Sequence, residues 1–292
     1  MKTATHPFQP ERGALHLRRQ IANGLTVTLT TLFAGAAIVF LGYLIAYVAL
    51  KGFRFLNVDF FTQAPVPEGE TGGGVFPAIE GTLIIVGIAA AIGVPLGLFT
   101  GIYLSEFGRG WLAGIVRFMV DMLTGIPTIL FGLFIWTLIV VPEHHFSGLA
   151  GGLALSIIMI PTVSRATEEV LRLVPKEMRE GSFALGATES RTILRVVVPA
   201  ARGGIITGIL LAVARVGGET APLLMTAFGT NFSRISIFRP MDALPLRIFD
   251  FTLSPVDAQR NQAFAGAFVL MLLVLVTSFA VRWATGGFKP RS

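Results

Sequence analysis

The 292-residue sequence has no cysteine and few charged residues. Without cysteine the chain can form no disulfide, no thiolate metal site and no cysteine nucleophile. Asp, Glu, Lys and Arg make up only 14% of the residues, whereas a soluble domain has about 25%. Hydrophobic residues make up 53% and gather in several long runs. This composition indicates a polytopic membrane protein.

The sequence also lacks the common signatures of nucleotide and hydrolytic chemistry. No lysine follows a glycine, so there is no GxxxxGK[ST] phosphate loop, and neither HExxH nor GxSxG occurs. His144 and His145 stand beside Glu143, but adjacent side chains point apart and no second ligand cluster follows, so no metal site is expected. The polar N-terminus shows no signal-peptide pattern. We expect no catalytic residue, metal or cofactor in this chain, and no hydrolysis of nucleotide by the chain alone.

Apolar runs of about 18 residues or more can cross a membrane as helices. We predict an all-α protein with six spans, at Gly24–Leu50, Ala78–Leu104, Met119–Val141, Leu149–Val163, Gly203–Leu224 and Ala263–Trp283. The fourth span is short, and its helix is expected to continue through Arg165 toward Val174. The predicted organisation is a segment at 1–23 with an interfacial helix over Glu11–Asn23, a first span at 24–50, an outer loop at 51–77, a core at 78–284 that holds the other five spans, and a tail at 285–292.

Glycine and proline modulate the predicted spans. Gly93, Gly97 and Gly101 recur every four residues, a spacing that lets two helices approach closely. Pro95, Pro127 and Pro161 lie within the second, third and fourth predicted spans, where each removes a backbone donor and is expected to kink its helix. A long outer loop, Ala227–Gln262, follows the fifth span, and a docking surface for an external partner is one interpretation of it.

The distribution of basic residues predicts the orientation. Most of the 23 Lys and Arg residues fall in the N-terminal segment, in the loop after the second span, in the interval 165–199 and at the C-terminus. Because Lys and Arg concentrate in cytoplasmic segments, both termini and this interval are predicted to be cytoplasmic. The net charge of +6 then reflects one face of a bilayer, and no nucleic-acid partner is expected.

The charged interval Arg165–Pro199 separates the fourth and fifth spans. Pro175 suits the start of a helix over Lys176–Leu185, because its missing N–H costs nothing there. Gly186 suits the left-handed position that closes such a helix, and a second helix is expected to begin near Thr188. These features predict a helical hairpin, either an ordinary surface element or one that engages another protein.

The same interval resembles a cytoplasmic motif of ABC importer permeases. That motif has Glu-Ala-Ala, three residues, Gly, nine residues, Ile, any residue and Leu-Pro. The sequence keeps the Glu, Gly and Pro positions and substitutes small or branched residues at the others: Glu180, Gly181, Ser182, Gly186, Val196, Val198 and Pro199. In the family this segment is the coupling helix, which docks on an ATPase subunit. The resemblance implies an ATPase-coupling role for Glu180, Gly181, Ser182, Ala184, Leu185, Gly186, Ala187 and Pro199.

Four longer segments narrow the resemblance. They are Gly72–Leu83, Asp121–Phe134, Glu168–Thr188 and Ala214–Leu224. They are similar to PstA-type permeases of phosphate ABC importers, and the Gly218–Pro222 run is closer to PstA than to the paralogous PstC. The resemblance implies an ABC importer permease fold in the bacterial inner membrane and phosphate import by alternating access. It also implies a PstC-type permease, a PstB-type ATPase dimer that carries ATP and Mg, and a PstS-type periplasmic phosphate-binding protein as partners.

Arg215 and Glu219 are the charged residues of the fifth predicted span. An arginine near the membrane midplane costs about 2.5–3.5 kcal/mol, so it must face the bundle interior or a water-filled cavity. Glu219 follows four residues later, so the two side chains are expected to pair on one helix face. A guanidinium fork suits a tetrahedral oxyanion, and Arg215, Glu219 and Thr220 are therefore placed on the substrate path. Arg165, at the end of the fourth span, is added as a residue that meets substrate as it leaves, and a membrane anchor is the other interpretation of it. A static ion pair is the other interpretation of the Arg215–Glu219 pair. Arg117 and Asp121 are expected to form a second pair with the same spacing.

Three other functions stay open at this point. The chain could be the permease for another oxyanion, or the PstC-type paralogue. A proton-coupled carrier could use the Arg215–Glu219 pair as a relay, but it should show internal repeats, and none is evident in the sequence. A membrane scaffold would explain the charged interval but would leave the midplane charges without a purpose.

Overall fold

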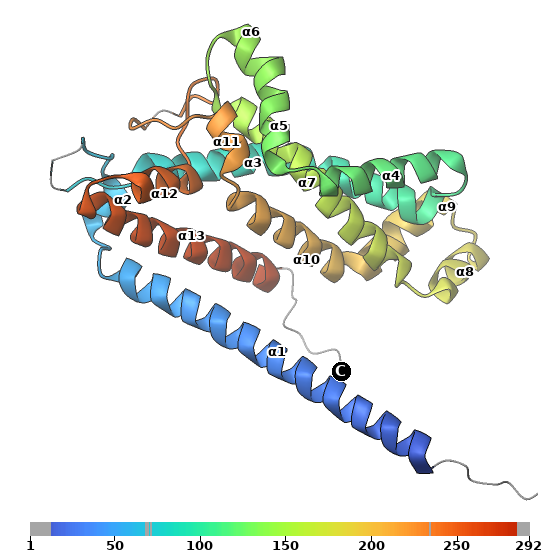
Figure 1. The fold of residues 1–292 in the computed structure, drawn as a ribbon. Helices are drawn as coiled ribbons and strands as arrows, with labels where there is room; N and C mark the ends of the chain where they lie inside the picture. The colour runs from blue at the N-terminus through green and yellow to red at the C-terminus, as the bar shows by residue number, and fades with distance from the viewer. Residues whose placement is uncertain (1–12, 68–69, 71, 234, 285–292) are drawn as a thin grey trace, which may run out of the picture. The chain divides into compact units, whose positions relative to one another are not determined.

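The computed structural model describes residues 13–67, 70, 72–233 and 235–284 (Figure 1). It divides into two compact units, Met1–Leu50 and Lys51–Ser292. All regular elements in the described ranges are helices, and a single isolated bridge joins Phe228 to Met241. Within those ranges, five helices are long and apolar enough to cross a membrane, or six if one bent pair forms a span.

The first unit consists of most of one long helix. Helix α1 spans Gly13–Phe53, and its side chains from Arg18 to Ala46 are exposed in the isolated chain. The separate interfacial helix expected up to Asn23 is not seen from Gly13 onward, because the helix continues without a break into the first span. No proline interrupts this stretch. Residues 11 and 12 of the expected interfacial helix lie outside the described residues.

Two helices form the centre of the second unit. Helices α3 (Phe76–Ile102) and α7 (Gly148–Arg172) pack along each other. A Cβ atom at Gly97 would lie 2.7 Å from Val163 Cβ, and one at Gly101 would lie 2.6 Å from the Ser164 carbonyl oxygen. The four-residue glycine spacing therefore serves close packing, as the sequence predicts. Helix α7 ends at Arg172, which confirms its predicted continuation beyond Val163.

The third predicted span is not one helix. Helix α4 (Trp111–Gly125) and the pair α5 (Thr128–Ile135) and α6 (Val141–Glu143), joined by a π-helical turn, are bent by 101°. Figure 1 shows α5 rising steeply from the end of α4. Ile126 is extended, with ψ 133°, because a residue before proline avoids the helical region. The kink expected at Pro127 is therefore a complete break.

The predicted boundaries of the fifth span were wrong at both ends. The helix runs continuously through α9 (Glu189–Thr192), a π-helical turn and α10 (Val198–Gly217), so it starts well before Gly203. Pro199 follows the π-helical turn directly, as the second residue of α10. The helix ends at Gly217, and α11 (Ala221–Thr226) is a separate short helix. Arg215 is therefore in the last turn of a long helix and not in its middle.

The two segments predicted to be outer loops carry short helices. Helix α2 (Val58–Thr62) lies within the predicted loop at 51–77, and α12 (Leu244–Leu253) lies within the predicted loop Ala227–Gln262. The last span, α13 (Asp257–Ala284), begins earlier than Ala263. An apolar cluster joins these elements, with Phe60, Leu244, Phe251 and Ala265 all buried.

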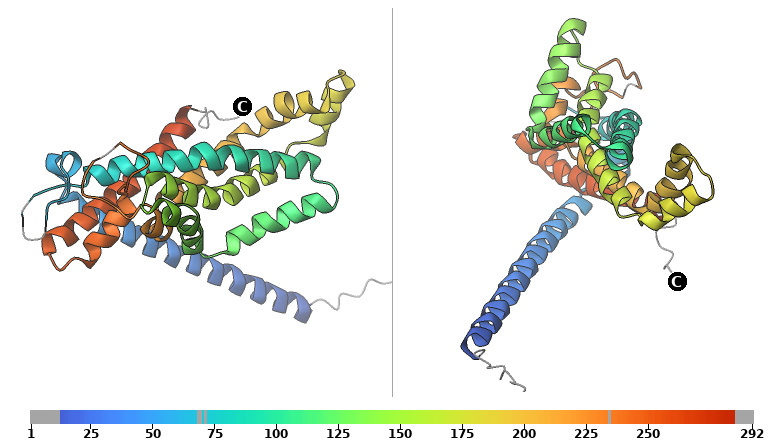
Figure 2. Two further views of the ribbon diagram at one scale, coloured as in Figure 1. Left: turned by 90° about the horizontal axis from the view of Figure 1, so that it is seen from above. Right: turned by 90° about the vertical axis from the view of Figure 1, so that its right-hand side faces the viewer.

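The charged interval forms the predicted hairpin. Helix α8 spans Lys176–Ala184, and Gly186 has φ +80°, which a residue without a Cβ adopts most easily. Pro175 is the residue before the helix rather than its first residue. In both views of Figure 2 the yellow hairpin projects from the end of α7. None of the nine residues of α8 is buried in the isolated chain.

Candidate translocation site and coupling hairpin

Two broken spans meet in the second unit. A Cβ atom at Gly132 of α5 would lie 2.6 Å from Pro222 Cα of α11, so these two short helices touch backbone to backbone. The contact brings together the break before Thr128 and the break after Gly217. Irregular backbone at membrane depth is tolerated only where protein buries it or where it lines a water-filled cavity. The meeting point of α5 and α11 is therefore the candidate translocation site.

Glu219 lies at this meeting point, but it does not bind Arg215. Its Oε2 atom accepts a hydrogen bond from Thr128 Oγ1 at 3.2 Å, and the residue is half-buried. Within the described part of the chain no ion pair joins Arg215 to Glu219. The predicted pair was wrong because the helix ends at Gly217, so the four-residue helical spacing no longer applies. Arg215 is instead exposed in the isolated chain, and Thr220 is half-buried beside Glu219.

Arg165 belongs to a network of charges at one end of α7. Glu168 is 1% exposed, and its carboxylate accepts hydrogen bonds from Arg172 at 2.6 Å, from Arg117 at 2.8 Å and from Arg165 at 3.5 Å. Arg165 also contacts Asp121 of α4. The expected Arg117–Asp121 pair was therefore wrong, since each residue binds a partner on α7. We call Glu168 with its three arginines and Asp121 the Glu168 network.

The Glu168 network was missed in the sequence, although part of its signal is present there. Glu168 follows Arg165 by three residues and precedes Arg172 by four, so all three share one helix face. The interhelical member, Arg117, is 51 residues away, and no local spacing predicts that contact. The network joins α4 to α7 and includes Arg165, the predicted path residue that lies on α7.

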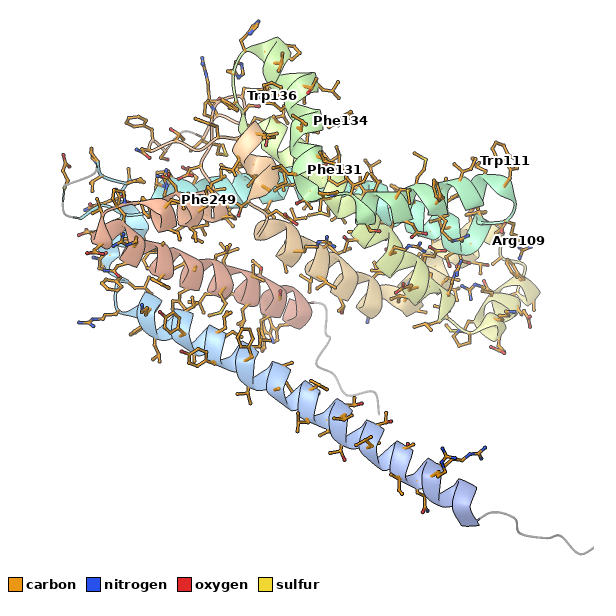
Figure 3. The ribbon with its side chains drawn as sticks, viewed as in Figure 1. Arg109, Trp111, Phe131, Phe134, Trp136 and Phe249 are labelled. Carbon is orange, nitrogen blue, oxygen red and sulfur yellow. The ribbon has the colours of Figure 1, made fainter. Side chains whose placement is uncertain are left out.

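The aromatic side chains of the bent span fall into two groups. Phe131 of α5 is buried, whereas Phe134 and Trp136, labelled in Figure 3, reach the surface of the isolated chain. Trp111 and Arg109 mark the turn before α4 in the same view. Both of these side chains are exposed. The exposed aromatic groups suit lipid or a second permease subunit.

The predicted coupling residues stand together on the hairpin. Glu180, Gly181, Ala184, Leu185 and Gly186 are exposed, and Leu185 has 91% of its surface accessible. Ser182 and Ala187 are half-buried, and the Ser182 hydroxyl hydrogen-bonds that of Thr192 at 2.8 Å. Pro199 is also exposed, but it lies in α10 and not in the hairpin.

Comparison with known proteins identifies the family. Residues 93–291 match the model of the binding-protein-dependent transport system inner membrane component. The chain is 40% identical to the phosphate transport system permease protein PstA of Yersinia pestis, over 88% of this chain and 87% of that protein. It is 39% identical to PstA of Haemophilus influenzae, over 90% of this chain and 94% of that protein. The chain belongs to the PstA permease family.

Solved structures agree on the fold of this PstA-family chain. It superposes with a TM-score of 0.60 on a chain of a bacterial alginate ABC transporter, at 14% identity over 93% of this chain and 96% of that one. An inward-facing MetNI methionine ABC transporter gives 0.58 at 20% identity, over 74% of this chain and 95% of that one. The predicted all-helical ABC permease fold is confirmed, as is a non-catalytic, multi-pass inner-membrane component.

A second buried ion pair of this PstA-family chain lies in the segment between α11 and α13. Arg247 of α12 binds Asp242 at 2.6 Å and donates to the Thr230 carbonyl oxygen at 3.1 Å. Burial raises the pKa of Asp242 to about 6, and the charge of Arg247 opposes that rise. Sequence reasoning missed this pair. It links α12 to the segment that precedes it.

Proposed function

We propose that this chain is the PstA-type half of an ATP-driven phosphate importer. The complete transporter would contain a PstC-type permease, a PstB-type ATPase dimer that binds ATP and Mg, and a PstS-type phosphate-binding protein. Both termini and the hairpin would face the cytoplasm, since most basic residues lie in these segments. Supporting this proposal, the chain has about 40% identity to phosphate permeases over most of its length.

The observation that carries the proposed transport role is the contact between the two broken spans. It joins Glu219 to Thr128 by a hydrogen bond. The exposed Arg215 and the half-buried Thr220 lie four residues before and one residue after Glu219 in the sequence. Because Glu219 does not neutralise it, Arg215 is available to bind a tetrahedral oxyanion with its planar fork. Glu219 can accept a hydrogen bond from a protonated phosphate oxygen, which sulfate at neutral pH does not offer. Binding at this site should be weak because conduction requires release.

In an alternating-access mechanism, the hairpin and the candidate translocation site would have different roles. Closure of the ATPase dimer would displace the hairpin residues Glu180–Ala187, and the attached helices would tilt. The path residues Arg215, Glu219 and Thr220 would then open to the other side of the membrane. Arg165 lies in the Glu168 network, near the proposed cytoplasmic exit, where it could meet phosphate as it leaves.

The test of the path role is the variant Arg215→Gln in the assembled complex. Phosphate uptake is expected to fall at least tenfold, since the loss of a charge-assisted hydrogen bond exceeds about 1.4 kcal/mol. Arg202→Gln is the matched control, because Arg202 is exposed on the same helix and should leave uptake unchanged. Near-normal uptake by Arg215→Gln with intact assembly would contradict the path role.

A second experiment separates ATP-driven import from a proton-coupled carrier. The complex is reconstituted in vesicles with and without the ATPase, and phosphate uptake is measured with ATP or with a proton gradient. Uptake is expected only with ATPase and ATP. Uptake driven by the gradient alone would favour the carrier, and transport of a different oxyanion would redirect the substrate assignment.

A further inference from the structure

Arg179 links helix α8 of the hairpin to the body of the second unit. Helix α8 buries none of its residues, yet the Arg179 side chain is only 20% exposed. Its guanidinium reaches Glu106 with two hydrogen bonds, Nε to Oε2 at 3.1 Å and Nη2 to Oε1 at 2.8 Å. The same group donates to the carbonyl oxygens of Val174 at 2.6 Å and Leu171 at 3.1 Å.

Arg179 therefore links three elements. Glu106 lies in the π-helical turn Tyr103–Phe107 that extends α3, and its side chain is 8% exposed. Leu171 and Val174 lie at the end of α7, where the last carbonyl groups lack the usual helical donors. The Leu171 carbonyl also accepts a hydrogen bond from the Val174 N–H at 3.2 Å. The guanidinium thus joins α8 to the ends of both central helices. The Ser182–Thr192 hydrogen bond, in contrast, lies inside the hairpin.

The geometry of this contact suits the transfer of movement. A bidentate arginine–carboxylate pair restricts direction as well as distance, which a single lysine contact does not. The backbone at residues 173–175 connects α8 only to α7, so it leaves α3 without a direct link. Two contacts connect α3 to these elements: the bridge from Glu106 to Arg179 of α8, and the close packing of Gly97 and Gly101 on α7.

We propose that the Arg179–Glu106 contact is a positioning contact that transmits displacement of α8 to α3. This inference rests on the proposed ATP-driven transport, because it requires an ATPase that moves α8. Arg179 and Glu106 touch neither substrate nor nucleotide in this role. Their loss uncouples ATP hydrolysis from phosphate movement and leaves the site at Arg215 intact.

The test uses the assembled transporter in vesicles, with phosphate uptake and ATP hydrolysis measured on the same preparation. Glu106→Ala removes the bridge and leaves the carbonyl contacts of Arg179 in place. The number of phosphate ions moved per ATP is expected to fall about tenfold, because a charge-assisted bidentate pair is lost. ATP hydrolysis itself should stay within about twofold of wild type, a factor that corresponds to less than one charge-assisted hydrogen bond. Arg179→Lys, which keeps the charge but not the fork, should give an intermediate ratio.

Arg109→Gln is the matched control, since Arg109 lies three residues from Glu106, is exposed and takes no part in the Arg179–Glu106 bridge. A covalent rescue covers the case in which Glu106→Ala fails to assemble. The chain has no native cysteine, so Glu106→Cys with Arg179→Cys can be joined by a short bis-maleimide, which should restore the transport ratio.

Two results would overturn different claims. A wild-type ratio in Glu106→Ala, or no recovery on cross-linking, would contradict the positioning contact. A wild-type complex whose ATP hydrolysis does not respond to phosphate-loaded binding protein would instead contradict the proposed function.

Discussion

At the scale of single residues, Glu168 shows how charge is accommodated in a chain with little of it. A buried carboxylate loses several kcal/mol of hydration, and only well-placed partners compensate that loss. Three arginines surround Glu168, and two of them come from its own helix. Their side chains are 30–55% exposed, so the network is buried at its centre and open to solvent at its edge. It is suited to joining α4 and α7 while leaving Arg165 accessible.

Glu168→Gln is expected to destabilise the protein by about 3 kcal/mol, at the low end for a broken buried pair because the arginines are partly exposed. The measurement is unfolding of the purified protein in detergent, followed by circular dichroism. Glu169→Gln is the control, since Glu169 is the exposed neighbour on the same helix and should change stability by less than about 0.5 kcal/mol. Equal effects of the two variants would show that burial of Glu168 does not matter.

At the scale of helices, the unbroken helices and the broken spans have different roles. Helices α3 and α7 pass each other without a break and hold the centre of the second unit. The breaks at Pro127 and after Gly217 lie where α5 and α11 meet. The unbroken helices α3 and α7 thus form the centre of the unit, while the broken spans supply the polar groups Thr128 and Glu219 of the candidate translocation site.

Close packing of α3 on α7 should be sensitive to a single methyl group. Gly97→Ala is expected to cost about 1–3 kcal/mol, as overpacking does in a tight interface, because its Cβ would lie 2.7 Å from Val163 Cβ. Gly87→Ala on the same helix is the control, since nothing lies within 4 Å of a Cβ there. Thermal unfolding in detergent compares the two variants. A loss of stability in Gly87→Ala of equal size would argue against close packing as the cause.

At the scale of the whole molecule, orientation decides which partner meets which surface. The hairpin must face the cytoplasm if it meets an ATPase, and the segment between α11 and α12 must face outward if it meets a binding protein. Basic residues favour this arrangement, and Leu185 and Ile235 mark the two sides with exposed side chains.

The orientation can be tested with single cysteines, because the chain has none of its own. Leu185→Cys is expected to react with a membrane-impermeant maleimide only in inside-out vesicles. Ile235→Cys should react only in right-side-out vesicles, and the cysteine-free protein serves as the control for background labelling. Labelling of both positions from the same side would contradict the proposed topology.

Individual residues show which features could be predicted from the sequence alone and which could not. Gly186 predicts the left-handed turn of the hairpin, and Gly97 and Gly101 predict close packing, because a missing Cβ has local consequences. The Arg215–Glu219 pair was wrong because the end of a helix at Gly217 depends on how α11 packs against α5. Arg117 was assigned to Asp121 for the same kind of reason, since its actual partner lies 51 residues away.

The sequence by itself determined the membrane class, the approximate spans, the hairpin and the family resemblance. Each of these depends on composition, on short spacing or on a linear motif, which act over a few turns of helix. Tertiary structure alone decided that Pro127 and Gly217 interrupt their spans at one place, that Glu168 gathers three arginines, and that Arg179 reaches Glu106. These contacts join residues distant in the chain, and their free energy depends on burial and direction that no local pattern specifies. The chain has few charged residues, and in the described part of the structure most of those that are buried form ion pairs.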